Sequence, residues 1–142
     1  MRNEEFIMIT YEALHHVSIA VTNIEKAKHF YGDVLGLQEI KRPDFDFEGA
    51  WYGVGNQQIH LIVFPTAQTL RGTTELSSRE GHFALRVADF EETLRHLTSK
   101  GIEILEKRKS KSGFAQIFCA DPDGNLIELN VEQSSLKKEC GT

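Results

Sequence analysis

The stretch His16-Val-Ser-Ile-Ala-Val21 decides the fold, because a segment of the same character, His82-Phe-Ala-Leu-Arg-Val87, begins 66 residues later. The segments that close each half also correspond: Ile59-His60-Leu61-Ile62-Val63 and Ile127-Glu128-Leu129-Asn130-Val131 stand 68 residues apart. A repeat of this length indicates the duplication of one supersecondary unit. Each copy carries two potential metal ligands at matching positions, so the repeat bears on function as well as on fold.

Each half predicts a strand, a helix and three further strands. In the first half, Thr22-Asn-Ile-Glu25 has the capping-box pattern, and apolar residues follow at helical spacing as far as Gly36. In the second half, Asp89-Phe-Glu-Glu92 caps a helix that ends at Gly101. The expected strands are 16–21, 37–41, 50–54, 58–64, 82–87, 102–107, 114–120 and 125–131. The fold class is therefore α+β, with two βαβββ modules in tandem.

The length of the chain suits a single domain, residues 1–142. We expect the first module at 13–66, an inter-module connection at 67–80, the second module at 81–132 and a frayed tail at 133–142. The connection is rich in Thr, Ser and Gly, which is typical of a link or a lid.

Composition excludes several classes of protein. The formal net charge is −5 and the basic residues form no coherent face, which argues against nucleic-acid binding. No apolar run approaches the roughly 18 residues that span a bilayer, and the acidic start is unlike a secretory signal. Cys119 and Cys140 are too few for a disulfide framework. We expect a cytoplasmic protein with a small-molecule substrate, no nucleic acid and no membrane.

Strand alternation places the ligand candidates on one side of each sheet. Successive side chains of a strand point to opposite faces, so His16, His60, His82 and Glu128 oppose the apolar residues that pack on the helices. Two such sheets curving toward each other would gather these four residues in one concave space. A buried carboxylate there favours a cation. Three imidazoles and one carboxylate suit Zn, Ni, Fe or Mn.

The same reasoning predicts the walls of a substrate pocket. Its candidate residues are Ser18, Phe64, Arg86, Asn130 and Trp51. Trp51 closes an aromatic-rich connecting segment that starts at Arg42 and includes Phe45 and Phe47. This segment either forms the rim of the pocket or packs the hairpin onto the other module.

From Leu14 to Val131 the chain resembles the vicinal oxygen chelate superfamily, which includes glyoxalases, bleomycin-resistance proteins and dioxygenases. The resemblance rests on His16-Val-Ser-Ile-Ala-Val21, Phe30-Tyr-Gly-Asp-Val-Leu-Gly-Leu37, Gly81-His-Phe-Ala-Leu-Arg-Val87 and Asp121-Pro-Asp-Gly-Asn-Leu-Ile-Glu-Leu129. It implies curved mixed sheets forming a cup around a divalent metal, frequent homodimers, and metal ligands at the four positions that strand alternation selects.

Two positions depart from the lactoylglutathione lyases of this family. His60 stands where those enzymes typically have an acidic residue, and Ala20 stands where an arginine often helps to hold glutathione. Arg86 occupies the equivalent place in the second module. Bleomycin-binding relatives tend to lack the ligands, so their presence here counts against simple sequestration.

The resemblance implies a metal-dependent lyase or isomerase of the glyoxalase type. Such an enzyme transfers a proton through a metal-bound enediolate of a small carbonyl or thiol-adduct substrate. Glu128 would be both ligand and catalytic base, with Glu132 a weaker alternative. Other readings stay open: an Fe(II) extradiol-type dioxygenase using His16, His82 and Glu128, a fosfomycin-type thiol transferase, or a non-enzymatic binding or resistance protein.

Overall fold

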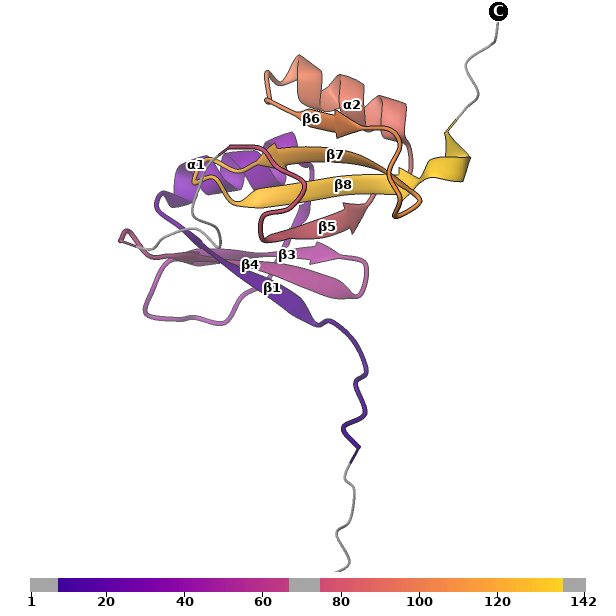
Figure 1. Ribbon diagram of the computed structural model, residues 1–142. Helices are drawn as coiled ribbons and strands as arrows, with labels where there is room; N and C mark the ends of the chain where they lie inside the picture. The colour runs from indigo at the N-terminus through magenta and orange to yellow at the C-terminus, as the bar shows by residue number, and fades with distance from the viewer. Residues whose placement is uncertain (1–7, 67–74, 137–142) are drawn as a thin grey trace, which may run out of the picture.

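A computed structural model of the chain describes residues 8–66 and 75–136 (Figure 1). Most of the expected inter-module connection, residues 67–74, lies outside the described residues, and so do the last six residues of the expected tail. Cys140 belongs to those six residues, whereas Cys119 is a buried free cysteine. None of the helices in the described ranges is long and apolar enough to cross a membrane.

The elements follow the order that the repeat predicts. The first module contains β1 (His16–Val21), α1 (Ile24–Lys28), the π-helix η1 (His29–Val34), β2 (Gln38–Ile40), β3 (Gly49–Val54) and β4 (Gln57–Val63). The second contains β5 (His82–Arg86), α2 (Phe90–Ser99), β6 (Leu105–Lys107), β7 (Phe114–Ala120) and β8 (Leu126–Glu132), followed by the short 3-10 helix η2 (Gln133–Ser135).

Both modules have the same sheet topology, which confirms the duplication. The strand orders are β1-β4-β3-β2 and β5-β8-β7-β6. In each sheet the first and fourth strands of the module run parallel and the other pairs run antiparallel. The two mixed sheets lie one above the other in Figure 1. The fold is therefore α+β with tandem βαβββ modules, as expected.

Both helix starts are capped in the same way, by a side-chain oxygen that accepts from the backbone N–H three residues later. Asp89 caps α2 as predicted, since its carboxylate accepts a hydrogen bond from the backbone N–H of Glu92. The prediction that Thr22 caps the first helix is wrong, because the side chain of Asn23 accepts from the backbone N–H of Lys26. The Thr22 hydroxyl is engaged elsewhere, with the second module.

The core lies between each sheet and its helix. On β1, Ile19 and Val21 are buried on the helix side, and on β4 Ile59 and Leu61 are buried on the same side. The opposite faces carry the ligand candidates, which agrees with the strand alternation. The two core faces join in one hydrophobic cluster that includes Phe30 and Tyr31 of η1 together with Phe90 and Leu97 of α2.

The turn between β7 and β8 holds the two modules together. Asp123 accepts hydrogen bonds from the backbone N–H and the hydroxyl of Thr22, at 3.0 and 2.6 Å. The Asn125 side-chain amide donates to the carbonyl of Ala20 at 3.2 Å. The end of β1 and this turn are therefore one of the places where the modules meet.

The expectation that the chain frays from residue 133 is wrong for its first residues. The backbone N–H of Gln133 donates to the carbonyl of Gly113 at 2.8 Å, and its side-chain oxygen accepts from the N–H of Ser110 at 3.0 Å. These bonds hold Gln133–Ser135 as a helical turn against the β6–β7 connection.

Candidate functional site

His60 lies at the centre of a stack of three rings on the free face of the first sheet. The strand register places it between Ser18 of β1 and Trp51 of β3. Its ring is parallel to the Trp51 indole, with centroids 3.9 Å apart and an interplanar angle of 6°. The His16 ring stacks on it at 4.1 Å and 19°. The fold therefore brings two of the predicted ligands, His16 and His60, into direct contact.

Burial and the neighbouring histidines favour the neutral form of the His60 ring. Its Nε2 lies 2.7 Å from Oε1 of Gln58, an acceptor, so Nε2 carries the proton and Nδ1 keeps its lone pair. Burial first, and then the charges of His16 and His15, lower the pKa of His60. A neutral imidazole is the form that binds metals. However, the in-plane lone pairs of two parallel rings do not converge on one point, so the exposed His16 ring must turn before both nitrogens can bind one ion.

The second sheet carries the other pair of predicted ligands. Nε2 of His82 lies 3.1 Å from Oε1 of Glu128, which is only 5% exposed. Nδ1 of His82 lies 2.7 Å from the carbonyl of Glu80, which can only accept. Nδ1 therefore donates. In the imidazolium form Nε2 donates to the carboxylate as an ion pair, and in the neutral form Nε2 and Oε1 are both acceptors that a bound cation would bridge.

Glu128 is held in place by a chain of side-chain hydrogen bonds. Its Oε2 accepts from the Asn130 amide at 2.6 Å, and the Asn130 carbonyl oxygen accepts from Nε of Arg86 at 2.7 Å. Arg86 also contacts Glu132 at 3.2 Å. Asn130 and Arg86 therefore fix the orientation of the Glu128 carboxylate through Oε2, and Oε1 faces His82. Metal ligands in proteins are commonly oriented by hydrogen bonds of this kind. It also ties Glu132, the weaker candidate base, to Arg86.

The four predicted ligands form two pairs and not one group. Across residues 8–66 and 75–136, no set of three or more His, Cys, Asp or Glu side chains is close enough to hold a metal ion. The expectation that both sheets of one chain would gather all four residues is therefore not met. The modules join through η1, the end of β1 and the β7–β8 turn. His16 and His82 line one hollow between the modules, but within the described residues no third candidate ligand comes close enough to complete a set.

The predicted pocket residues divide between the same two faces. Ser18 is exposed beside His60, Trp51 stacks on that histidine, and Phe64 is 56% exposed just past β4. Arg86 and Asn130 lie on the second sheet, next to Glu128. Each half of the site thus has its own wall, aromatic on the first sheet and polar on the second.

Sequence reasoning missed two residues of the site. Gln58 fixes the ring of His60, and Phe118 meets His82 edge-to-face with centroids 5.4 Å apart. Both follow from strand alternation: Gln58 lies two residues before His60, and Phe118 pairs with Glu128 in the register of β7 and β8. Phe118 therefore stands in the second module where Trp51 stands in the first.

Comparison with known proteins identifies the class to which this fold and this site belong. Residues 13–129 match the model of the Glyoxalase/Bleomycin resistance protein/Dioxygenase superfamily. The chain belongs to this superfamily, and it is an enzyme of the glyoxalase family.

Particular relatives have two different activities. The chain is 30% identical over 126 residues to a lactoylglutathione lyase of Neisseria meningitidis, with 85% of this chain and 91% of that protein covered. It is also 30% identical over 122 residues to the glutathione transferase FosA of Serratia marcescens, covering 84% and 81%. Among solved structures, a Bacillus anthracis protein assigned to the glyoxalase family superposes with a TM-score of 0.75 at 26% identity, covering 89% of this chain and 99% of that one.

Proposed function

We propose that this protein is a divalent-metal-dependent lyase or isomerase of the glyoxalase type that works as a homodimer. The observation that carries the proposal is the His82–Glu128 pair, an imidazole nitrogen and a buried, oriented carboxylate oxygen 3.1 Å apart. The His16–His60 pair of a second copy would complete the ligand set. Three histidines and a glutamate suit Zn, Ni, Fe or Mn.

The sheet topology supports a shared site. β1 and β5 are the outer strands of their sheets, and β1 bears His16 while β5 bears His82. An outer strand presents one row of backbone groups that can pair with another chain. Pairing β1 of one copy beside β5 of the other would bring the first ligand pair of one chain against the second ligand pair of its partner.

The residues of the chain have distinct roles in the proposed reaction. When bound, the metal supplies Lewis acidity toward a substrate with two adjacent oxygens. Glu128 is the proposed base: Oε1 takes a proton from the carbon next to a carbonyl and returns it to the neighbouring carbon. Asn130 and Arg86 keep this carboxylate oriented during both transfers. Burial around Glu128 excludes water from the proton in transit.

A subunit-mixing experiment tests the proposal. One variant carries His16→Ala and His60→Ala, and the other carries His82→Ala and Glu128→Gln. Each homodimer should neither bind metal tightly nor convert a hemithioacetal of an α-oxoaldehyde. A mixed dimer contains one intact site of its two, and random mixing of equal amounts makes half of the dimers mixed, so about a quarter of the wild-type metal sites and turnover should return.

The outcomes test separately whether the site is shared between two copies and whether the protein has lyase activity. If mixing restores nothing while each single chain still dimerises, the site is not shared between copies. If metal sites return but the wild-type protein loaded with Zn, Ni, Mn or Fe turns over no hemithioacetal, the proposal of lyase activity is wrong. The control is wild type mixed with either variant, which should show intermediate values.

The relationship to the FosA transferase favours one second candidate, the addition of a thiol to an epoxide such as fosfomycin. The same ligand pairs would serve it, but His60 lies close against Trp51 and narrows the first wall. Incubation of metal-loaded protein with fosfomycin and glutathione, followed by mass spectrometry of the adduct, distinguishes the two reactions.

A further inference from the structure

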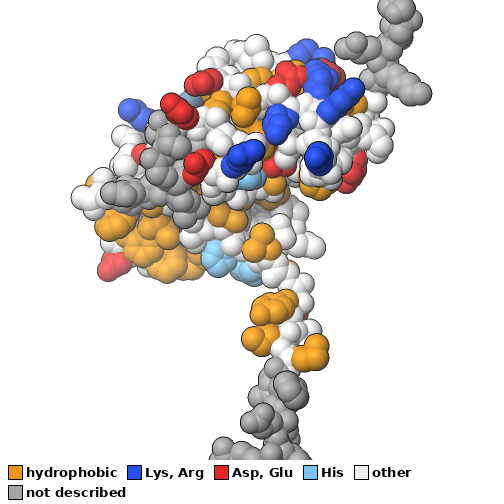
Figure 2. All heavy atoms as spheres, in the orientation of Figure 1, with side chains coloured by type: hydrophobic (Ala, Val, Ile, Leu, Met, Phe, Trp, Pro, Cys, Tyr) orange, Lys and Arg blue, Asp and Glu red, His pale blue; other side chains and the backbone are white. Residues whose placement is uncertain are grey.

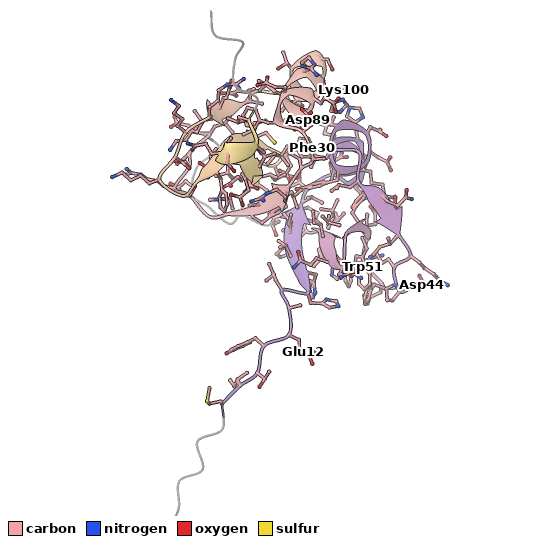
Figure 3. The ribbon with its side chains drawn as sticks, turned by 90° about the vertical axis from the view of Figure 1, so that its right-hand side faces the viewer. Glu12, Phe30, Asp44, Trp51, Asp89 and Lys100 are labelled. Carbon is pink, nitrogen blue, oxygen red and sulfur yellow. The ribbon has the colours of Figure 1, made fainter. Side chains whose placement is uncertain are left out.

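Residues 8–14, which we call the arm, leave the body of the molecule just before β1 and extend away from it (Figure 1). In Figure 3, Glu12 lies on the arm, well apart from Trp51 and Asp89 on the body. Figure 2 shows hydrophobic side chains along this projecting segment. Four large apolar side chains of the arm are between 66 and 86% exposed: Met8, Ile9, Tyr11 and Leu14. Exposed apolar groups gathered in this way are typical of a binding surface.

The arm has the pattern of a strand with one apolar face. Successive side chains of an extended chain point to opposite sides, so Ile9, Tyr11 and Ala13 share one face. Thr10 and Glu12 belong to the opposite face. β-Branched and aromatic residues also favour the extended conformation. The arm is therefore suited to lie extended against an apolar surface, with Ile9 and Tyr11 turned toward it.

The core of the molecule is left open at one end, between the two modules. A hollow of about 530 Å³ lies there, along β5 and beside the start of β1. Val17 shares a face of β1 with Ile19 and Val21, which are each 1% exposed, yet Val17 is only half-buried. On β5, Phe83 and Leu85 are half-buried as well. The residues at this end of the core therefore lack the cover that the rest of the core has.

The lining of the hollow suits an apolar occupant. Its apolar residues include Val17, Val54, Ile59, Phe83 and Leu85. Its polar side chains are those of His16, Gln57, Gln58 and His82, and none of the described residues that line it is Asp, Glu, Lys or Arg. A segment that enters the hollow therefore buries apolar surface without having to neutralise a carboxylate, an ammonium or a guanidinium group.

We propose that the arm of one copy of this chain binds in the hollow of a second copy, so that the two copies exchange arms. The proposal rests on the homodimer of the proposed function, in which β1 of one copy lies beside β5 of the other. The arm continues β1 and the hollow runs along β5, so this pairing brings the arm to the hollow of the partner. The extended residues 8–13 span about 20 Å, which is enough to follow β5 along its whole length.

The arm cannot easily fill the hollow of its own chain. Leu14, its last residue, already lines that hollow, and the preceding residues lead away from it. To enter, the chain would have to reverse its direction immediately before Leu14. The arm contains no Gly, Pro, Asn or Asp, which are the residues that favour tight turns. A second copy is therefore the occupant that the sequence of the arm favours.

Cross-linking between singly substituted chains tests the exchange. Every chain carries Cys140→Ser, and Cys119 is buried. Chains with Tyr11→Cys are mixed with an equal amount of chains with Gln57→Cys, since Gln57 is exposed and lines the hollow. The protein is treated with EDTA and then with a short bis-maleimide. Random mixing makes half of the dimers mixed, so up to about half of the protein should migrate as a covalent dimer on a denaturing gel.

The controls for this experiment use the same thiol on the arm. Neither singly substituted chain alone should give the covalent dimer, and nor should Tyr11→Cys mixed with Lys111→Cys, since Lys111 is exposed in the β6–β7 connection. A chain that carries both Tyr11→Cys and Gln57→Cys should also give covalent dimers. If that chain loses both thiols and still migrates as a monomer, the arm occupies its own hollow and the proposal is wrong.

The affinity of the dimer provides a second measurement. Ile9→Ser with Tyr11→Ser removes the apolar face of the arm and should raise the dimer Kd at least about tenfold in sedimentation equilibrium. The matched control is Thr10→Ser with Glu12→Ser, which alters the opposite face of the same arm and should stay within about threefold of wild type. Circular dichroism checks that both variants keep their fold. Equal Kd values for the two variants would overturn the proposal.

The outcomes distinguish the arm exchange from the proposed enzyme. Neither measurement depends on metal or turnover, so the cross-link in a protein that converts no hemithioacetal supports the exchange and counts against the lyase alone. A dimer that forms without the cross-link overturns the exchange alone. A wild-type protein that stays monomeric overturns the exchange together with the shared site.

Discussion

The hydroxyl of Tyr31 donates a 2.7 Å hydrogen bond to Oδ2 of Asp121, and this bond joins the two modules in the interior. Asp121 also accepts from the backbone N–H groups of Asp123 and Asn125 and from the Asn125 side chain. Burial raises the pKa of Tyr31 well above its ordinary value, so the phenol stays protonated as a donor. This contact is one of several that hold the second module against the first.

Tyr31→Phe should lower the free energy of unfolding by about 1.5–3 kcal/mol, because a buried carboxylate loses a hydrogen bond that the Phe ring cannot replace. Urea unfolding followed by circular dichroism measures the change. Tyr52→Phe is the matched control, since the Tyr52 hydroxyl is buried with no hydrogen-bond partner among the described residues. The control should be neutral or stabilising. Equal losses for the two variants would contradict the assignment.

The stability of the protein should carry a pH-dependent contribution from Asp121. Burial raises the pKa of this carboxyl above its ordinary 3.8, against the opposing effect of its hydrogen bonds. The folded state therefore binds a proton at pH values where the unfolded chain does not. The stabilising contribution is full below about pH 3.8 and is lost as the pH rises through the folded-state pKa.

The comparison with Asp121→Asn isolates this effect, because other carboxyl groups titrate in both proteins. Between about pH 7 and about pH 4, the stability of the wild type relative to Asp121→Asn should increase as the pH falls. Urea titrations at several pH values provide the measurement. A difference that stays constant, or that shrinks toward acid pH, would show that Asp121 has no raised pKa.

Substitution of two glycines by alanine should change the stability of the protein in opposite directions. A Cβ at Gly49 would lie 2.3 Å from the carbonyl oxygen of Leu61 and 3.1 Å from the Arg42 guanidinium. Gly49→Ala must push β3 from β4 and should cost about 1–3 kcal/mol or more. A Cβ at Gly32 in η1 meets only Tyr52, at an ordinary 3.7 Å. Gly32→Ala should instead stabilise by about 0.4–1 kcal/mol. Thermal unfolding of the two variants checks both signs.

Asn130 should act on the metal through Glu128. Asn130→Ala removes the 2.6 Å hydrogen bond to Oε2 and should weaken Zn binding by about 10–100-fold. Competition with a chelating dye measures the affinity without any need for turnover. Gln116→Ala is the control, because Gln116 pairs with Asn130 in the register of β7 and β8. Unchanged Zn affinity in Asn130→Ala would mean that Glu128 needs no support from behind, or that it is not a ligand.

Much of the fold was predictable because it depends on local patterns. The alternation of apolar residues in His16–Val21 and its repeat at His82 identified both segments as strands and the faces they present. The cap at Asp89 was predictable because its partner, Glu92, is three residues away. The cap at Thr22 was not, because the competing partner of Thr22 is Asp123, 101 residues away in the sequence.

The candidate site shows the same difference between what local patterns predict and what long-range contacts decide. The sequence by itself determined which residues are the candidate ligands: the repeat selects His16, His60, His82 and Glu128, and a period of two places them on the free faces. Only the tertiary structure decided how they are grouped. Module packing through Tyr31, Asp121 and Thr22 leaves the four residues of one chain in two pairs. The sequence could not predict this grouping, because the hydrogen bonds and buried area that orient one sheet against the other join residues about a hundred positions apart.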